Sequence, residues 1–338
     1  MAADHSTTTF AALPDLASAR VGGRALAAND DFFARKDNLV KTAPAIFIPG
    51  KYTTRGKWMD GWESRRRRTP GHDWCVVKLG MRGRIHGVNV DTSFFTGNFP
   101  ARCSIDALDA TRAVTKRLAE REGSPWTTIL PETGLTGDAD NFIRIESEQP
   151  WTHVRLNIFP DGGVARLRVH GEVAVDWTRV TATHRVVDLA AIEHGGLVLA
   201  ASDMHYGAKD NIIMPGRAEN MGDGWETKRR RGPGHDWLIL RLGAPGRLEK
   251  IEIDTNHFKG NFPDRASIEG CCLPGAQPTD LESAAWTLIL PQTKLQAHRR
   301  HFFTRELLDP GVVSHVRLNI FPDGGISRVR VHGTLAQD

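Results

Sequence analysis

Polar and apolar residues alternate along several short stretches of this chain. In His153–Phe159, apolar side chains take positions 154, 156 and 158, and polar side chains take positions 153, 155 and 157. The same period of two returns in 164–170 and, more briefly, in 88–91 and 251–254. A period of two is typical of a β-strand with one buried face. The sequence FPDGG between the first two stretches predicts that they form an antiparallel hairpin.

Three sequence blocks occur twice in the chain. The first, DGWESRRRRTPGHDW, returns as DGWETKRRRGPGHDW with 12 of 15 positions identical. The third, HVRLNIFPDGGVARLRVHG, returns with 16 of 19 positions identical, and the second carries DT-x-x-F-x-GNFP in both copies. The copies of the three blocks lie at 60–74 and 223–237, 79–100 and 242–263, and 153–171 and 315–333. A spacing this long indicates duplication of a whole domain, since solenoid and propeller repeats are much shorter.

The duplication predicts two domains of the same fold. We expect a mobile terminus at 1–15, a first domain at 16–178 and a second at 179–338. Helical periodicity is rare: Ala107–Glu122 has the pattern of a helix, but its counterpart at 270–285 contains two prolines, so we treat this segment as peripheral. Short strands separated by glycine and proline turns favour an all-β fold, with a β-sandwich or jelly roll in each half.

Composition excludes several classes of protein. The chain has 338 residues, 40% of them hydrophobic, and a net charge of +4, which is the balance of a folded globular protein and not of a disordered one. No apolar run is long enough to span a membrane, and the first residues do not resemble a secretory signal, so we expect a cytoplasmic protein. The four cysteines lack the spacing of a disulfide framework or zinc site, and known nucleophile and nucleotide motifs are absent, so we expect neither metal nor cofactor.

The run of basic residues in the first block suggests binding of an anion. Arg65–Arg68 returns as 228–231, each time between Asp-Gly-Trp-Glu and Pro-Gly-His-Asp-Trp. A surface for nucleic acid would spread over one face with many more unpaired cations than a net charge of +4 provides. A loop that holds a small carboxylate in a guanidinium fork explains the run better. The alternative is that these arginines pair with Glu63 and Asp73 and only stiffen the loop.

Histidine, aspartate and asparagine side chains add candidates for proton transfer and hydrogen bonding. His72 and Asp73 lie in a turn that opens a strand, where loops of β-sandwiches carry function. Asp91 follows a strand and can either act on a ligand or cap the next turn. Asn98, in the Gly-Asn-Phe-Pro loop, can fix loop geometry or bind a polar ligand. The polar face of the strand at 153–157 has to meet solvent, a cleft or another subunit.

The doubled blocks closely resemble those of the allantoicase family, and the resemblance covers about 16–333. It implies a tandem jelly-roll fold of galactose-binding-like topology, hydrolysis of allantoate to ureidoglycolate and urea, and a homo-oligomer. Such a reaction needs guanidinium groups for the substrate carboxylate, a general acid and base, and amides for the ureido groups. The catalytic candidates are then His72, Asp73, Asp91, His170, His235, Asp236, Asp254 and His332. The substrate-binding candidates are Glu63, Arg66, Arg67, Asn98, Arg155, Asn157, Glu226, Arg229, Arg230, Asn261, Arg317 and Asn319.

Two rival functions stay open from the residues alone. A tandem carbohydrate-binding protein would share the fold, but sugar sites usually offer exposed aromatic rings, and here the repeated polar residues are mainly Arg, His and Asp. A nucleic-acid-binding protein should be retained on heparin at moderate salt, which a small anion site should not produce. Both repeats keep the candidate residues, so each half can carry a complete site or the halves can share one. We favour independent sites, because they need no special geometry.

Overall fold

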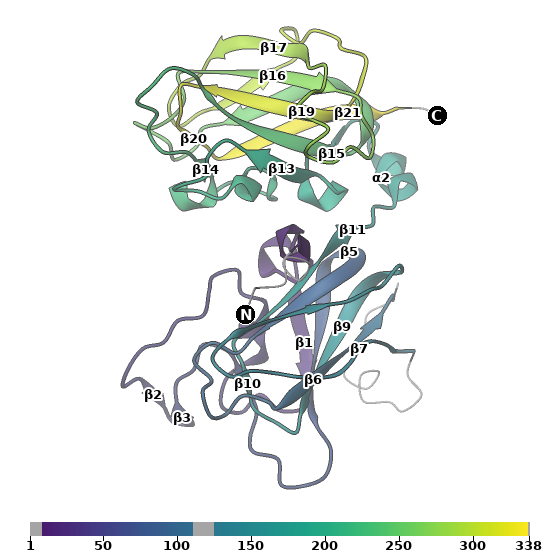
Figure 1. Cartoon of the computed structure of the whole chain (residues 1–338), viewed down its shortest axis with the longest axis vertical. Coiled ribbons are helices and arrows are strands. Elements are labelled where there is room, and N and C mark those ends of the chain that lie inside the picture. The colour runs from purple at the N-terminus through teal and green to yellow at the C-terminus, as the bar shows by residue number, and fades with distance from the viewer. Residues whose placement is uncertain (1–8, 111–124, 337–338) are drawn as a thin grey trace. The chain divides into compact units, whose positions relative to one another are not determined.

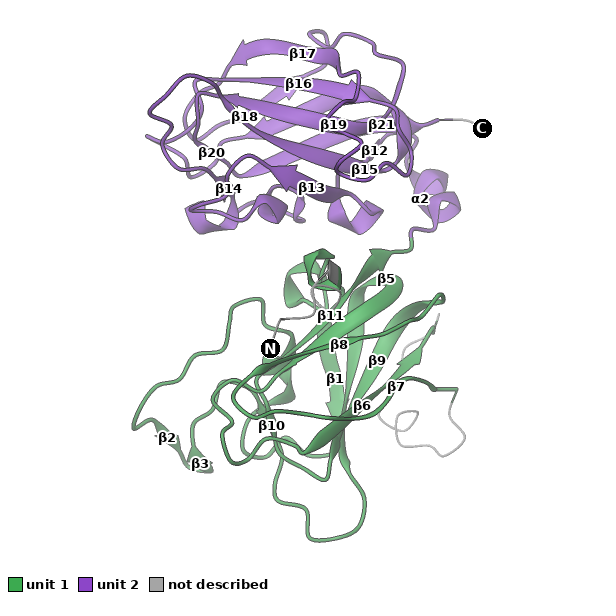
Figure 2. Ribbon diagram, viewed as in Figure 1, with its two compact units in different colours: residues 1–174 green, residues 175–338 purple. Residues whose placement is uncertain are grey.

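The computed structural model describes residues 9–110 and 125–336, and the chain divides into two compact units, 1–174 and 175–338 (Figure 2). Each unit contains a β-sandwich, so the all-β tandem jelly-roll fold is confirmed. No helix in the described parts of the chain has the length and apolar character needed to cross a membrane. The domain limits of 16–178 and 179–338 stay a prediction.

Unit 1 is built around one long strand, β5 (Asp73–Asp91), that serves two layers (Figure 1). Its first part pairs with β1 and β9, and its second part pairs with β8 and β11. The sheet order is β1-β5-β9-β6-β7, and β4 and β10 form a separate short ladder. The other strands of the unit are β1 (Arg24–Ala28), β2 (Tyr52–Thr53), β3 (Gly56–Lys57), β4 (Trp62–Glu63), β6 (Arg102–Leu108), β7 (Thr127–Gly134), β8 (Asp140–Arg144), β9 (Pro150–Phe159), β10 (Gly163–Val164) and β11 (Arg166–Val173).

Unit 2 repeats this topology around β15 (Asp236–Asp254), which pairs with β13 and β19 and then with β18 and β21. Its other strands are β12 (Val187–Asp188), β13 (Leu197–Ala201), β14 (Trp225–Glu226), β16 (Arg265–Cys271), β17 (Thr287–Lys294), β18 (Arg300–Phe303), β19 (Val312–Phe321), β20 (Gly325–Ile326) and β21 (Arg328–Leu335). The helical elements of the described chain are α2 (Trp177–Thr183) and the 3-10 turns η1 (Thr9–Ala12), η2 (Ala19–Val21), η3 (Lys36–Val40), η4 (Ile192–His194), η5 (Lys209–Ile213) and η6 (Met221–Asp223).

The apolar residues of the alternating stretches form the core of the sandwich. Val154, Leu156 and Ile158 of β9 are fully buried, as the period of two predicts. The tryptophan of each Asp-Gly-Trp-Glu motif is buried as well. Its indole Nε1 donates a 2.8 Å hydrogen bond to a backbone carbonyl, that of Asp30 for Trp62 and that of Asp203 for Trp225.

Three expectations differ from the structure or fall outside it. The predicted hairpin is wrong: β9 and β11 pair with different parts of β5 and not with each other, because the turn between them carries the chain from one layer to the other. Of the terminus expected to be mobile, 1–8 lie outside the described residues, whereas the 3-10 turn η1 follows directly and its Phe10 is buried. Of the helix expected at 107–122, the first two residues end strand β6, and 111–122 lie outside the described residues.

Candidate active site

The three repeated blocks meet at one end of each sandwich, although they lie far apart in the sequence. In unit 1 the turn 159–163 contacts both other blocks. The carboxylate of Asp161 accepts a 2.8 Å hydrogen bond from the Arg67 backbone amide, and the phenylalanine ring of the turn lies 4.7 Å from the His72 ring. The last glycine of the turn donates a 2.8 Å hydrogen bond to the Asn98 carbonyl.

The same three contacts occur in unit 2. Asp323 accepts from the Arg230 amide at 2.9 Å, and the rings of His235 and Phe321 are 4.7 Å apart. The amide at 325 donates to the Asn261 carbonyl at 2.8 Å. The repeated residues are therefore gathered by the fold into one region of each unit.

Beside this turn in unit 1, a carboxylate holds an arginine and an asparagine in place. Asp106 on β6 accepts through Oδ2 from Arg155 Nε at 3.2 Å, Arg155 Nη2 at 2.8 Å and Asn157 Nδ2 at 2.8 Å. Its Oδ1 accepts from Thr128 Oγ1 at 2.7 Å. Burial would raise the pKa of Asp106, but these hydrogen bonds and the charge of Arg155 outweigh it and hold the pKa below its usual range. We call His72, Arg67, Asp106, Arg155 and Asn157 the arginine–asparagine site.

The surroundings of His72 lower the pKa of its ring, which favours the neutral imidazole. Burial lowers the pKa of His72, and the charges of Arg155 and Arg67 lower it further. The Asn157 side chain and the charge of Asp106 oppose this shift without cancelling it. At neutral pH the ring is therefore uncharged and able to accept a proton.

Two buried polar atoms of this site have no hydrogen-bond partner among the described residues. Asn157 is 3% exposed, and no hydrogen bond of normal geometry from the described residues reaches its Oδ1, although the His72 ring lies close enough to interact with this side chain and its Nδ2 donates to Ser104 and Asp106. Arg67 uses Nη1 for a 2.8 Å bond to Asp73, and its buried Nε donates to no described group. Buried polar groups are almost always hydrogen-bonded to protein, water or ligand, so an orphaned acceptor and an orphaned donor in one site indicate a place for a bound molecule.

Unit 2 carries the same arrangement with one substitution. Glu269 replaces Asp106, and its Oε2 accepts from Arg317 Nε at 2.8 Å and from Asn319 Nδ2 at 2.8 Å. Asn319 Oδ1 and Arg230 Nε are again buried without a partner among the described residues. The arginine loop here lines a cavity of about 330 Å³. The same pair of orphaned atoms thus occurs in both units, which chance does not explain.

A tryptophan covers the arginine of each site. The guanidinium of Arg155 lies 5.2 Å from the Trp126 ring, and that of Arg317 lies 4.9 Å from the Trp286 ring. A cation over an aromatic face is held in a fixed orientation. These rings therefore help to position the two guanidinium groups.

The structure places Glu63 and Asn98 together in a neighbouring cleft. Asn98 Nδ2 donates to Glu63 Oε1 at 2.7 Å, and Asn261 makes the same bond to Glu226 in unit 2. In unit 1 the pair lines a cavity of about 390 Å³ with Lys57 among its walls, and burial raises the pKa of Glu63. In each unit this pair of side chains forms a second polar group beside the repeated turn, separate from the arginine–asparagine site.

Other predicted residues have local structural contacts. Asp73 is buried and accepts hydrogen bonds from both Arg67 and Asn29 Nδ2, and Asp236 does the same with Arg230 and Ser202. They stiffen the arginine loop, as the alternative explanation of the basic run stated for Asp73, whereas its other named partner, Glu63, is bonded to Asn98. Arg66 and Arg229 are exposed.

The remaining four catalytic candidates lie apart from the arginine–asparagine sites. Asp91 and Asp254 each accept from the backbone amide two residues on, at 2.8 and 2.9 Å, which is the capping role. His170 and His332 lie on β11 and β21, which pair with the far parts of β5 and β15. His170 Nδ1 donates to the Leu13 carbonyl at 3.0 Å, so this histidine anchors the N-terminal segment.

Asp106 and Glu269 were missed by the sequence reasoning. The signal was present, because the second block continues beyond Pro100 and Pro263 as R-x-S-I-D and R-x-S-I-E. Alternation in that segment places the serine and the acid on one face of a strand. Ser104 and Ser267 do face Asn157 and Asn319, as their hydrogen bonds show.

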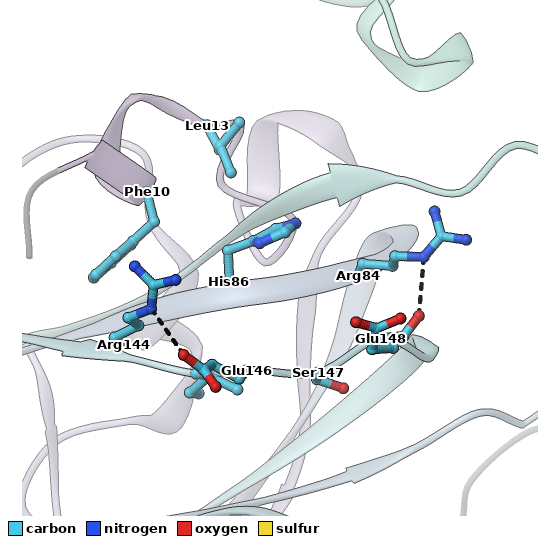
Figure 3. Close-up of a pocket in the computed structure, with 9 residues that line it drawn as sticks. Phe10, Leu13, Arg84, His86, Arg144, Glu146, Ser147 and Glu148 are labelled. Atoms are coloured by element: carbon cyan, nitrogen blue, oxygen red, sulfur yellow. Dashed lines mark hydrogen bonds and ion pairs between the residues drawn. The ribbon is translucent and has the colours of Figure 1, made fainter. Parts of the chain in front are cut away.

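A larger cavity of about 750 Å³ lies elsewhere in unit 1 (Figure 3). Phe10, Leu13, Arg84, His86 and Arg144 are among its walls. Figure 3 shows Arg84 bonded to the Glu148 carbonyl and Arg144 paired with Glu146. None of the predicted site residues lines it, so size alone does not make it the active site. Among the described residues no cluster of three or more His, Cys, Asp or Glu side chains could hold a metal ion.

Comparisons with known proteins agree with the repeated architecture. The family model described as "Allantoicase repeat" matches residues 14–174 and 187–336. The chain is 50% identical to "Probable allantoicase 1" of Burkholderia mallei, over 95% of this chain and 94% of that protein. It is also 50% identical to "Probable allantoicase" of Photobacterium profundum, over 94% and 96%. The crystal structure of allantoicase from Saccharomyces cerevisiae superposes with a TM-score of 0.81 at 31% identity, covering 97% of this chain and 96% of that one.

Proposed function

The chain belongs to the allantoicase family, and we propose that it hydrolyses allantoate to ureidoglycolate and urea at the arginine–asparagine sites. The match spans nearly the full length of both partners in each comparison, so the chain contains the whole repeated unit of its relatives. The enzyme is a hydrolase that cleaves a C–N bond of a ureido compound. A carbohydrate-binding function without catalysis is not favoured by these relatives.

The orphaned atoms match the groups of the substrate. Allantoate has one carbon that bears a carboxylate and two ureido groups. A carboxylate is the natural partner of a guanidinium edge such as Arg67 Nε. A ureido N–H is a donor for a buried acceptor such as Asn157 Oδ1. This pair of unsatisfied groups, present in both units, is the observation that carries the proposal.

The reaction needs a proton to move from water to the departing nitrogen. As the C–N bond breaks, the second ureido nitrogen can share its lone pair with the central carbon, and water supplies the hydroxyl of ureidoglycolate. The nitrogen must gain a proton to leave as urea. Of the predicted acid–base candidates that lie at the sites, Asp73 and Asp236 are held by Arg67 and Arg230. This leaves His72 and His235, and the pKa of His72 is lowered. Asp106 and Arg155 act as positioning residues for Asn157.

We also propose that the protein is a cytoplasmic homo-oligomer without a required metal or cofactor, acting on allantoate and not on nucleic acid or membranes. Light scattering on a size-exclusion column would test the oligomeric state, with a single-chain mass as the contradicting result.

Urea release from allantoate tests the function. Purified wild-type protein should release one urea per allantoate, and Arg67→Ala combined with Arg230→Ala should raise KM strongly. Arg65→Ala is the matched control, because Arg65 belongs to the same loop but is paired with Asp30 at 2.7 Å. Folded wild-type protein that releases no urea from allantoate would refute the proposal.

A further inference from the structure

The two arginine–asparagine sites differ at their carboxylate. Both oxygens of Asp106 are occupied in unit 1: Oδ2 by Arg155 and Asn157, and Oδ1 by the Thr128 hydroxyl at 2.7 Å. A carboxylate held by that many donors is a poor proton acceptor. The Asp106 side chain is 10% exposed.

In unit 2 one oxygen of the carboxylate is open. Glu269 Oε2 receives the bonds from Arg317 and Asn319, and no hydrogen bond from the described residues reaches Oε1. The cause lies on the neighbouring strand, where Leu288 pairs with Glu269 as Thr128 pairs with Asp106. A leucine has no hydroxyl to donate. The Glu269 side chain is also more accessible, at 23% exposed.

We propose that Glu269 is a catalytic residue, the proton carrier of the second site, and that unit 2 therefore performs most of the turnover. The inference rests on the proposed function. Unit 1 keeps the substrate-binding atoms, but it has only the neutral His72 as a base, and that base is weakened by its surroundings. The duplicated domain thus combines a fast site and a slow one.

The proposed step is balanced in atoms and charge. The central carbon of allantoate already has four bonds, so its bond to one ureido nitrogen breaks as the bond to the water oxygen forms, assisted by the lone pair of the other ureido nitrogen. The electron pair of the broken bond stays on the departing nitrogen. Glu269 Oε1 takes the proton that the water releases and passes it to that nitrogen, which leaves as urea. The carboxylate is regenerated, and Oε2 keeps Arg317 and Asn319 in place throughout.

Glu269→Gln in the full-length protein tests the assignment, because the amide keeps an oxygen for Arg317 but cannot take a proton at neutral pH. General acid–base catalysis contributes about 100-fold or more, so kcat should fall to one tenth or less, the remainder coming from unit 1, with KM little changed. A residual kcat of about half or higher, as two equal sites would leave, overturns the proposal. Glu252→Gln is the matched control: Glu252 is a buried carboxylate of unit 2 held by Arg300 at 2.6 and 2.9 Å, outside the site.

A second pair of variants, at Leu288, tests the open oxygen of Glu269 without replacing Glu269 itself. Leu288→Thr introduces the hydroxyl that unit 1 has, whereas Leu288→Val introduces the same shape without it. Donation to Glu269 Oε1 should reduce kcat in the threonine variant relative to the valine variant, because an oxygen that already accepts a hydrogen bond takes a proton from water less readily. Equal kcat values for the two variants, together with unimpaired Glu269→Gln, refute the role of Glu269. Absence of urea release by the wild type would instead refute the proposed function itself.

Discussion

Replacing Asn157 by leucine should separate substrate binding from stability. The side chain is 3% exposed, so the substitution places an apolar group of similar size in a closed space. The variant loses the bonds from Nδ2 to Ser104 Oγ at 3.0 Å and to Asp106 Oδ2 at 2.8 Å. Together these contribute about 3 kcal/mol.

Two gains offset this loss. Removing the orphaned Oδ1 relieves about 1–3 kcal/mol of desolvation cost, and burying the leucine side chain adds about 2 kcal/mol. The net change in the free energy of unfolding should therefore lie between zero and a gain of about 2 kcal/mol, which leaves Tm unchanged or raises it by up to about 8 °C. Loss of a hydrogen bond between Oδ1 and a ureido N–H should weaken allantoate binding at this site by about tenfold.

Differential scanning calorimetry and titration calorimetry with allantoate measure the two effects. Asn141→Leu is the control, because Asn141 is fully bonded: it accepts from the Thr136 amide at 2.8 Å and donates to the carbonyls of Val90 and Thr136, each at 3.0 Å. It should destabilise the protein by about 3 kcal/mol and leave binding by the folded protein unchanged. Unchanged allantoate affinity in Asn157→Leu, or a stability loss as large as that of Asn141→Leu, would refute the reasoning.

Three further outcomes are expected. Arg166→Met should lower the free energy of unfolding by about 3–5 kcal/mol, because this guanidinium is 1% exposed and bonded to Asp60 Oδ2 at 2.7 Å and to the carbonyls of Ala43 and Asp60. Denaturant unfolding measures the loss, and a value below about 1 kcal/mol would contradict the burial argument. Burial lowers the pKa of His153 to about 4, so the unfolded chain binds more protons than the folded chain between pH 6.5 and 4. The free energy of unfolding should therefore fall by roughly 3 kcal/mol as the pH is lowered through that window. His153→Gln should remove most of this pH dependence, and an equal slope in the variant would contradict it. Prolonged chelation should leave urea release unchanged, whereas a stoichiometric metal with activity lost on its removal would overturn the expectation that no metal is needed.

The sequence predicted the fold because the signals were local or repeated. A period of two along β9 identified its buried face, and the doubled blocks identified two copies of one domain. The prediction of a hairpin was wrong because a Gly-rich turn after a strand shows that the chain reverses direction, but does not show which strand the next one pairs with. Which strand β11 pairs with is decided by β5, about 80 residues earlier in the chain.

The candidate site was predicted only in part, because residue type alone does not show which side chains the fold brings together. His72, Arg67, Arg155 and Asn157 were identified by residue type, and the structure brings them together. His170 has the same chemistry, but its strand lies at the far part of β5, which spacing along the chain does not show. Asp106 was overlooked because its signal is a short continuation of the second block in which the acid itself differs between the copies, R-x-S-I-D in one and R-x-S-I-E in the other.

A crystal structure of Glu269→Gln soaked with allantoate tests the central claim most directly. The account predicts substrate in both units, with its carboxylate on Arg67 Nε and Arg230 Nε and a ureido N–H on Asn157 Oδ1 and Asn319 Oδ1. Titration calorimetry should then count two allantoate molecules per chain. Allantoate bound in the Glu63–Asn98 cleft or in the larger cavity of unit 1, with the arginine–asparagine sites empty, would contradict the account.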